Sequence, residues 1–142
     1  MTSVPAIDKL SVGGTVAGAE YHIDRDNLVK YAGVSGDFNP IHYRDDIARE
    51  VGLPGVLAHG MLTMGLAIAP VVEWLGDPSR IIEYEVRFSR PVVVDANDGA
   101  VVSVVARVGA VDAESHAARI DLTVKVSGET VLAKARARVN IA

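Results

Sequence analysis

Cysteine is missing from this chain of 142 residues. Without it the protein can form no disulfide bond, hold no metal ion through thiolates and use no thiol nucleophile. Proteins that rely on no disulfide are typical of reducing compartments. We therefore expect a cytoplasmic location.

Long apolar runs are missing as well. The most apolar stretch, residues 60–75, is shorter than the ~20 residues that span a bilayer, and it contains Glu73. Residues 1–10 include a proline and two charged residues but no apolar segment of the secretory type. We expect neither a membrane span nor a secretory leader.

Charge of one sign is nowhere concentrated. The net charge is -4, both signs are interspersed, and no basic stripe could follow a phosphate backbone, so nucleic acid is not an expected partner. No cluster of ligand residues suggests a metal site, and no cofactor is expected. Apolar residues, in contrast, make up 49% of the chain, which predicts one folded domain over residues 1–142.

The order of hydrophobic patterns predicts helices followed by an antiparallel meander of strands. Asp24 or Asp26 can cap a first helix, and Pro40 then turns the chain into a loop. The remaining patterns predict a short helix at residues 44–51, an apolar helix at 60–75 and strands at 81–90, 100–108, 116–126 and 131–141. The apolar helix has too little polar face for the surface, so a sheet must cover it, which gives an α+β fold.

Asp37 and His42 are five residues apart, with Pro40 between them. A turn at this proline can direct both side chains into one cleft, whereas a regular strand would send them to opposite faces. An imidazole beside a carboxylate suits the proton transfers of water addition or elimination near neutral pH. The same segment is also an ordinary turn, in which Asp37 and Asn39 bond the local backbone. The loop residues alone leave both interpretations open.

The start of the apolar helix offers a second feature. Its first backbone N–H groups lack partners within the helix and lie at the positive end of the helix dipole, where Gly60 has no side chain to shield its N–H group. Such a helix end can stabilise the oxyanion of a thioester enolate. Alternatively, Gly60 only permits close packing. His59, beside it, could contact a substrate or bond a nearby backbone group.

Two blocks of the sequence together resemble the MaoC-like dehydratases, also called hydratase 2. These blocks are YAGVSGDFNPIH at residues 31–42 and HGML at residues 59–62, and RFSRPV at residues 87–92 extends the likeness. The resemblance implies a hot-dog fold, in which an antiparallel sheet wraps around a long central helix. In length and motif the chain is similar to the catalytic subunits of mycobacterial (3R)-hydroxyacyl-ACP dehydratases.

The resemblance also implies roles for the matching residues. Asp37 and His42 would be the catalytic pair that activates water and moves the C2 proton, and the Gly60 N–H group would be the oxyanion donor. Asn39 would support the loop. One position departs from the pattern, since Ile68 stands where some members of the family carry a serine in the central helix. A hydroxyl contact at that place is therefore not expected.

The resemblance implies an enzyme that interconverts (3R)-hydroxyacyl and trans-2-enoyl thioesters. We expect an acyl-ACP substrate in fatty-acid elongation. The alternatives are an acyl-CoA substrate in fatty-acid degradation, a non-catalytic acyl-binding hot-dog subunit, and a thioesterase. Retention of both Asp37 and His42 argues against the non-catalytic subunit. The expected protein partner is a second hot-dog subunit, in a homodimer or in a heterodimer with a related chain.

Other residues are assigned by their position in the expected helices. Met61, Met64 and Trp74 have helical spacing and are predicted in the core, although Met61 could line an acyl tunnel. Asp45 and Asp46 are predicted in the first turn of the short helix, where the helix dipole favours acidic residues.

Overall fold

Strands and helices account for most of the described chain. The computed structural model describes residues 6–142, so the expectation for a leader at residues 1–10 lies partly outside the described residues. Strand β1 (Thr15–Ile23) is followed by helices α1 (Arg25–Ser35), α2 (Asp45–Glu50) and α3 (Gly60–Leu75). Strands β2 (Ile81–Phe88), β3 (Ala100–Asp112), β4 (Ala117–Val126) and β5 (Glu129–Asn140) come next. The predicted helices and strands are confirmed close to their expected positions, and β1 is a strand that the pattern did not predict.

The strands form one antiparallel sheet in the order β1-β3-β4-β5-β2. The prediction of a simple meander after the helices was therefore wrong at both edges of the sheet. Only β3, β4 and β5 follow one another, whereas β1 joins beside β3 and β2 pairs with β5. The reason is that the sheet curls around α3, which contacts β1 on one side and β2 on the other.

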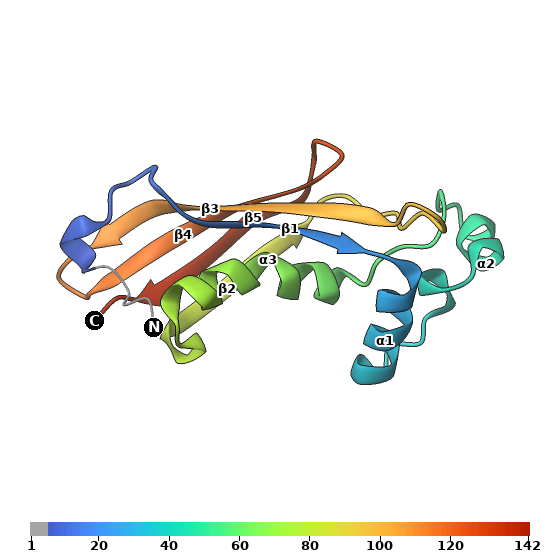
Figure 1. Ribbon diagram of the computed structural model, residues 1–142, viewed down its shortest axis with the longest axis horizontal. Helices are drawn as coiled ribbons and strands as arrows, with labels where there is room; N and C mark the ends of the chain where they lie inside the picture. Colours follow the sequence, from blue (N-terminus) through green and yellow to red (C-terminus); the bar gives the residue numbers. More distant parts are fainter. Residues whose placement is uncertain (1–5) are drawn as a thin grey trace.

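One face of the sheet packs against α3, which runs along it (Figure 1). In β3 every second residue is buried, as in a strand with one covered face: Val102, Val104, Ala106 and Val108. From its side, α3 buries Ala67, Val71 and Leu75. This is the hot-dog arrangement that the resemblance implies, with a sheet wrapped around a long helix.

The helix α3 is not buried all round. Met61, in its first turn, is 60% exposed, whereas Met64 and Trp74 are partly buried. The core prediction was therefore wrong for Met61, whose position in the first turn leaves it in contact with solvent. Across residues 6–142, no helix combines the length and the apolar character that crossing a membrane requires.

A tyrosine side chain ties β2 to α3. The Tyr84 hydroxyl donates a hydrogen bond of 2.7 Å to the carbonyl oxygen of Met64. Partial burial raises the pKa of Tyr84 to about 12, because the ionised phenol would lose solvation there. The phenol therefore remains a hydrogen-bond donor at physiological pH.

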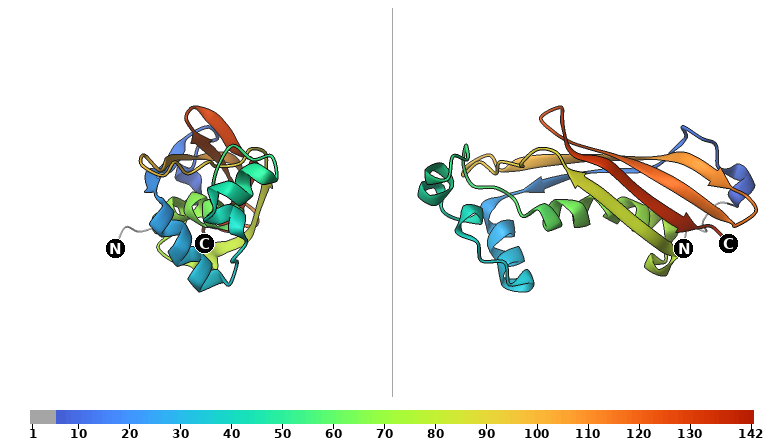
Figure 2. Two further views of the ribbon diagram at one scale, coloured as in Figure 1. Left: turned by 90° about the vertical axis from the view of Figure 1, so that its right-hand side faces the viewer. Right: turned by 180° about the vertical axis from the view of Figure 1, so that it is seen from behind.

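Helices α1 and α2 lie toward one end of the sheet, away from both described chain ends (Figure 2). Asp24 caps α1 through a reciprocal pair of hydrogen bonds with Asn27, and Gly36 ends the helix with a φ of 76°, in the left-handed region that favours glycine. Asp45 and Asp46 occupy the first turn of α2, as predicted. We call residues 24–59 the end segment, and β1–β5 with α3 the sheet body.

Arg25 connects the parts of the end segment to the sheet body. Its guanidinium donates hydrogen bonds of 3.0 and 3.1 Å to the two carboxylate oxygens of Asp45, and its Nε donates one of 2.7 Å to the carbonyl oxygen of Val94. The hydrogen bonds from Arg25 hold the pKa of the Asp45 carboxyl below its ordinary value. One cation therefore joins α1, α2 and the chain that leads into β3.

Candidate active site

The loop after α1 is shaped by its own polar side chains. The segment Pro40–His42 forms a 3-10 turn, in which Asn39 Oδ1 accepts a hydrogen bond from the N–H of Ile41. Asp37 Oδ1 accepts another from the N–H of Asn39, at 3.2 Å. The local-turn interpretation therefore holds for Asn39 and for one oxygen of Asp37, and the second oxygen of Asp37 remains available.

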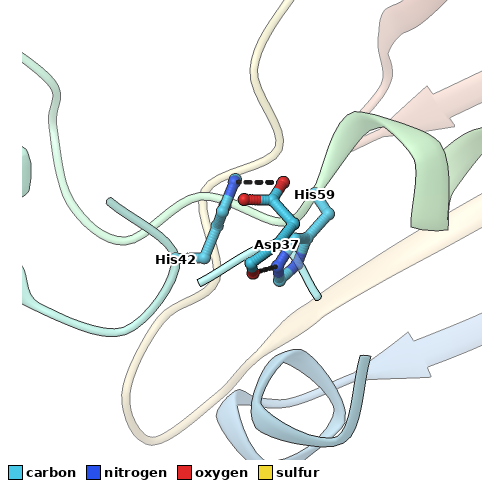
Figure 3. Close-up of side chains that lie close together, drawn as sticks. All are labelled: Asp37, His42 and His59. Carbon is cyan, nitrogen blue, oxygen red and sulfur yellow. Dashed lines mark hydrogen bonds and ion pairs between the residues drawn. The ribbon is translucent and has the colours of Figure 1, made fainter. Parts of the chain in front are cut away.

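Asp37 and His42 face each other across the turn (Figure 3). The distance from Asp37 Oδ2 to His42 Nε2 is 3.7 Å. The Asp37 side chain is 51% exposed and that of His42 only 9%, so solvent reaches the pair from the carboxylate side. This distance is too long for a direct hydrogen bond but allows one water molecule to bond both groups. The turn at Pro40 thus brings the two side chains together, as the spacing predicted.

A backbone carbonyl fixes the proton of the His42 ring. Nδ1 of His42 lies 2.7 Å from the carbonyl oxygen of Leu57. Because a carbonyl oxygen can only accept a hydrogen bond, we assign the hydrogen to Nδ1. In the neutral ring, Nε2 then has a free lone pair on the side where Asp37 lies. This is the tautomer that a general base in this position needs.

His59 packs behind the pair. Its ring stacks on that of His42, with centroids 3.8 Å apart and planes at 21°, and it meets the Tyr31 ring edge-on at 4.8 Å. His59 Nε2 donates a hydrogen bond of 3.1 Å to the backbone carbonyl oxygen of Asp37 (Figure 3). The residue is 1% exposed, and its Nδ1 has no hydrogen-bond partner within residues 6–142. The structure has the bond to a nearby backbone group, and His59 also lines a cavity beside Asp37, so contact with a substrate stays a prediction.

Asp37, His42 and His59 place possible metal-ligand atoms within 4.8 Å of one another. A metal ion lies close to the plane of each imidazole that binds it, because the nitrogen lone pair lies in that plane. The rings of His42 and His59 are stacked, so no single point lies near both planes at bonding distance. The arrangement favours proton transfer over metal binding.

Gly60 begins α3 beside this pair. His59, which caps the helix, makes no side-chain hydrogen bond to the first-turn N–H groups, so a ligand oxygen could bind them. A methyl group on Gly60 would lie 2.9 Å from Cε1 of Phe88, closer than such carbon atoms approach in proteins. The close-packing interpretation of Gly60 therefore holds, and the N–H group remains open as well.

Two cavities meet at the start of α3. The first, of about 330 Å³, contains His42, and the second, of about 340 Å³, contains Asp37. Gly60 and Phe88 line both cavities. We call them the His42 cavity and the Asp37 cavity. The remaining wall of the His42 cavity is mainly apolar, with Leu57, Val92, Val131 and Leu132, whereas that of the Asp37 cavity includes Tyr31, Ser35 and Met61.

Leu57 and Phe88 belong to this site although residue-by-residue reasoning did not select them. Leu57 contributes a backbone carbonyl, which every residue type has, so no sequence signal could have identified it. Phe88 reaches the site because the end of β2 passes the start of α3, a contact between segments far apart in the chain. The only hint was the block RFSRPV at residues 87–92, which includes Phe88.

The stretch of chain that contains this site matches a known family. Residues 9–128 match the family described as "MaoC like domain". The chain belongs to this family. A solved MaoC-like dehydratase is 37% identical with a TM-score of 0.94, over 99% of this chain and 43% of that chain. The resemblance drawn from residues 31–42 and 59–62 is thereby confirmed.

Two curated proteins illustrate what the chain is similar to. The 3-hydroxyacyl-thioester dehydratase X of Mycobacterium tuberculosis is 41% identical over 70 residues, which are 49% of this chain and 24% of that protein. The 3-hydroxybutyryl-CoA dehydratase of Methylorubrum extorquens is 32% identical over 111 residues, which are 78% of this chain and 68% of that protein. The chain spans a quarter or less of the length of several curated relatives that it matches.

Proposed function

We propose that the protein is a hydro-lyase that interconverts (3R)-hydroxyacyl and trans-2-enoyl thioesters. The observation that carries the proposal is the pairing of Asp37 Oδ2 with His42 Nε2 at 3.7 Å, with the Nε2 lone pair left free by the bond from Nδ1 to Leu57. Two acceptors at this distance suit the binding and deprotonation of one water molecule.

The chemistry follows from the positions of three groups. In the hydration direction, His42 Nε2 takes a proton from a water molecule that Asp37 also binds, while the water oxygen bonds to C3 of the enoyl thioester. Electrons of the C2–C3 double bond move to the thioester oxygen, and the Gly60 N–H group stabilises the resulting enolate. C2 then receives the proton from the acid–base pair. One water is added in total, and the reverse sequence is dehydration without a cofactor.

For the carrier of the acyl chain we propose acyl carrier protein, in fatty-acid elongation. Support comes from the similarity in length and motif to subunits that dehydrate (3R)-hydroxyacyl-ACP. An acyl-CoA substrate is the second candidate, because the relative from Methylorubrum extorquens is named as a CoA dehydratase. A cytoplasmic location and a single domain over residues 1–142 remain predictions.

A second hot-dog subunit is part of the proposal. Strand β2 lies at an edge of the sheet, so the described chain pairs it on one side only, and it carries Ile82 at 48% exposure. Edges of this kind are usually paired or covered. A homodimer, or a heterodimer with a related chain, would supply that cover.

The experiment that tests the proposal is an absorbance assay. The purified protein is incubated with trans-2-enoyl-ACP and, separately, with trans-2-enoyl-CoA. We expect loss of the enoyl absorbance, no release of free thiol and formation of the 3R product, identified by chiral chromatography. Faster turnover of the ACP substrate would support the proposed carrier. Release of thiol would instead indicate a thioesterase, and no change with either carrier would contradict the proposal.

A further inference from the structure

Phe88 lies where the two cavities of the site meet. Of the described residues, only Phe88 and Gly60 line both the His42 cavity and the Asp37 cavity. The Phe88 ring lies directly over the first residue of α3, since a methyl group on Gly60 would be within 3.3 Å of three of its ring atoms. The ring therefore separates the two cavities at the proposed oxyanion donor.

The backbone beneath this ring is held in place while the ring itself has room to turn. Phe88 pairs with Leu132 of β5, and the next two residues donate hydrogen bonds of 3.1 and 3.4 Å from their N–H groups to the Val131 carbonyl oxygen. The Phe88 side chain nevertheless remains 53% exposed. Side chains with exposed surface change rotamer within nanoseconds. The partition is thus a half-exposed ring on a fixed strand.

The two cavities differ in the chemistry of their walls. The His42 cavity also has polar lining residues, Thr63, Ser89 and Arg90. Most of its wall is nevertheless apolar, with four aliphatic side chains that suit an alkyl chain: Leu57, Val92, Val131 and Leu132. The Asp37 cavity offers hydroxyl groups from Tyr31 and Ser35, which suit the polar arm of a thioester. A thioester whose carbonyl oxygen lies at Gly60 can extend its acyl chain into the first cavity and its carrier arm into the second.

We propose that Phe88 sets the length of the acyl chain that the site accepts, because its ring forms the adjustable wall of the His42 cavity beside Gly60. The nature of the ligand rests on the proposed function. A smaller side chain at residue 88 enlarges the space for the acyl chain, and a larger one reduces it. Phe88 is a specificity-determining residue in this proposal and takes no part in proton transfer.

The test compares Phe88→Ala and Phe88→Trp with the unaltered protein. Binding of butyryl-pantetheine and decanoyl-pantetheine is measured by calorimetry, because these saturated thioesters cannot be hydrated. Each buried methylene strengthens binding by about fourfold, so space for two more methylenes should raise the preference for decanoyl-pantetheine by roughly fifteenfold in Phe88→Ala. Phe88→Trp is expected to lower the same preference. Val101→Ala is the control, since Val101 is an exposed aliphatic residue of β3 that lines neither cavity.

The outcomes separate this proposal from the proposed function. A preference that stays the same in both Phe88 variants overturns the role of Phe88, even where the enoyl thioester is hydrated normally. A preference that shifts in opposite directions supports the role, even where no hydration is observed. Equal weakening of both ligands in folded variants, as judged by circular dichroism, also overturns it. The role of Phe88 is also overturned if neither thioester binds to the unaltered protein or to Phe88→Ala.

Discussion

The sheet body and the end segment are held together by different forces. In the sheet body, strands β3, β4 and β5 bury alternate aliphatic residues against α3, and ladder hydrogen bonds connect each strand to its neighbours. In the end segment, specific polar contacts set the structure, such as the Arg25 bonds to Asp45 and the bond from His42 to the Leu57 carbonyl oxygen. A buried apolar cluster tolerates changes in side-chain shape at a small cost in stability, whereas a hydrogen bond requires a particular distance and angle.

This difference assigns separate tasks to the two regions. The candidate acid and base, Asp37 and His42, both lie in the end segment, while the sheet body supplies Gly60 and the apolar wall of the His42 cavity. Changes in the end segment should therefore alter turnover more than stability. Changes in the sheet body should alter stability more than turnover.

The largest effects should follow from changing the acid–base pair. In Asp37→Asn and His42→Ala we expect kcat to fall by about two to four orders of magnitude, the range for loss of a positioned acid or base. The midpoint of thermal unfolding should change little in Asp37→Asn, because Asp37 is half exposed and the turn keeps its backbone bonds. It should fall in His42→Ala, which stays folded but leaves the Leu57 carbonyl oxygen without its donor. Steady-state kinetics and circular dichroism check both. Near-normal turnover in a folded variant would remove that residue from the proposed site.

Ile120→Ala should produce the opposite result in the sheet body. Ile120 is fully buried in β4, and removal of its side chain leaves a cavity that costs about 2–5 kcal/mol of the free energy of unfolding. Urea unfolding measures this loss, with Thr123→Ala, exposed on the same strand, as the control. Turnover per folded molecule should be retained. A loss of kcat as large as that in Asp37→Asn would show that the two regions are not separable.

The sheet and the helices could be predicted from sequence to the extent that they depend on local pattern. Richness in valine and isoleucine, with breaks at hairpin spacing, identified β3, β4 and β5, and alternation was clear in β5 alone. The apolar run identified α3. β1 was missed because its sequence, TVAGAEYHI, has glycine and alanine where a clear alternation would show large apolar residues. The pairing of β2 with β5 was missed because the residue pattern of one strand does not indicate which other strand it pairs with.

The contacts of the candidate site likewise divide into local contacts, which the sequence predicts, and tertiary contacts, which it does not. The proximity of Asp37 and His42 follows from a turn at Pro40, which is local, and it was predicted. The stacking of His59 on His42 joins residues on either side of α2, and the contact between Phe88 and Gly60 depends on how β2 passes α3. Such contacts are set by tertiary packing, so the spacing of residues along the chain does not predict them.

His59 offers a finer test of how the end segment is positioned. His59→Gln keeps a donor that can reach the Asp37 carbonyl oxygen but loses the stacked ring, and His59→Phe keeps the ring but loses the donor. Loss of one hydrogen bond of about 1 kcal/mol corresponds to roughly a fivefold change, so we expect a fall in kcat of about fivefold to tenfold in His59→Phe. His59→Gln should stay closer to the unaltered protein, with KM little changed in both. A larger loss in His59→Gln would show that stacking matters more than the bond.

The smallest effect should come from Tyr84→Phe, which changes only the link between β2 and α3. Loss of the hydrogen bond to Met64 should lower the free energy of unfolding by about 1 kcal/mol at neutral pH and leave turnover unchanged. The pKa of Tyr84 is raised from 10.0 to about 12 in the folded protein, so the unfolded chain ionises first as pH rises. This contribution to stability is therefore complete below pH 10 and declines between pH 10 and 12.

Urea unfolding at about pH 7 and about pH 11 checks this prediction, because the tyrosine contribution differs between the two conditions. The unaltered protein should lose more stability across this interval than Tyr84→Phe does. An equal decline in both proteins would show that the phenol is as well solvated in the folded state as in the unfolded chain.

The bond between His42 and the Leu57 carbonyl oxygen has a consequence for genetics. Every one of the twenty amino acids supplies the same carbonyl group, so no codon change at position 57 deletes this acceptor. A saturation screen at position 57 would report on the Leu57 side chain, which lines the His42 cavity, and not on the carbonyl contact that decides which nitrogen of the imidazole carries the proton. Selection can preserve the acceptor only through the shape of the main chain, and a survey of conserved side chains would not reveal it.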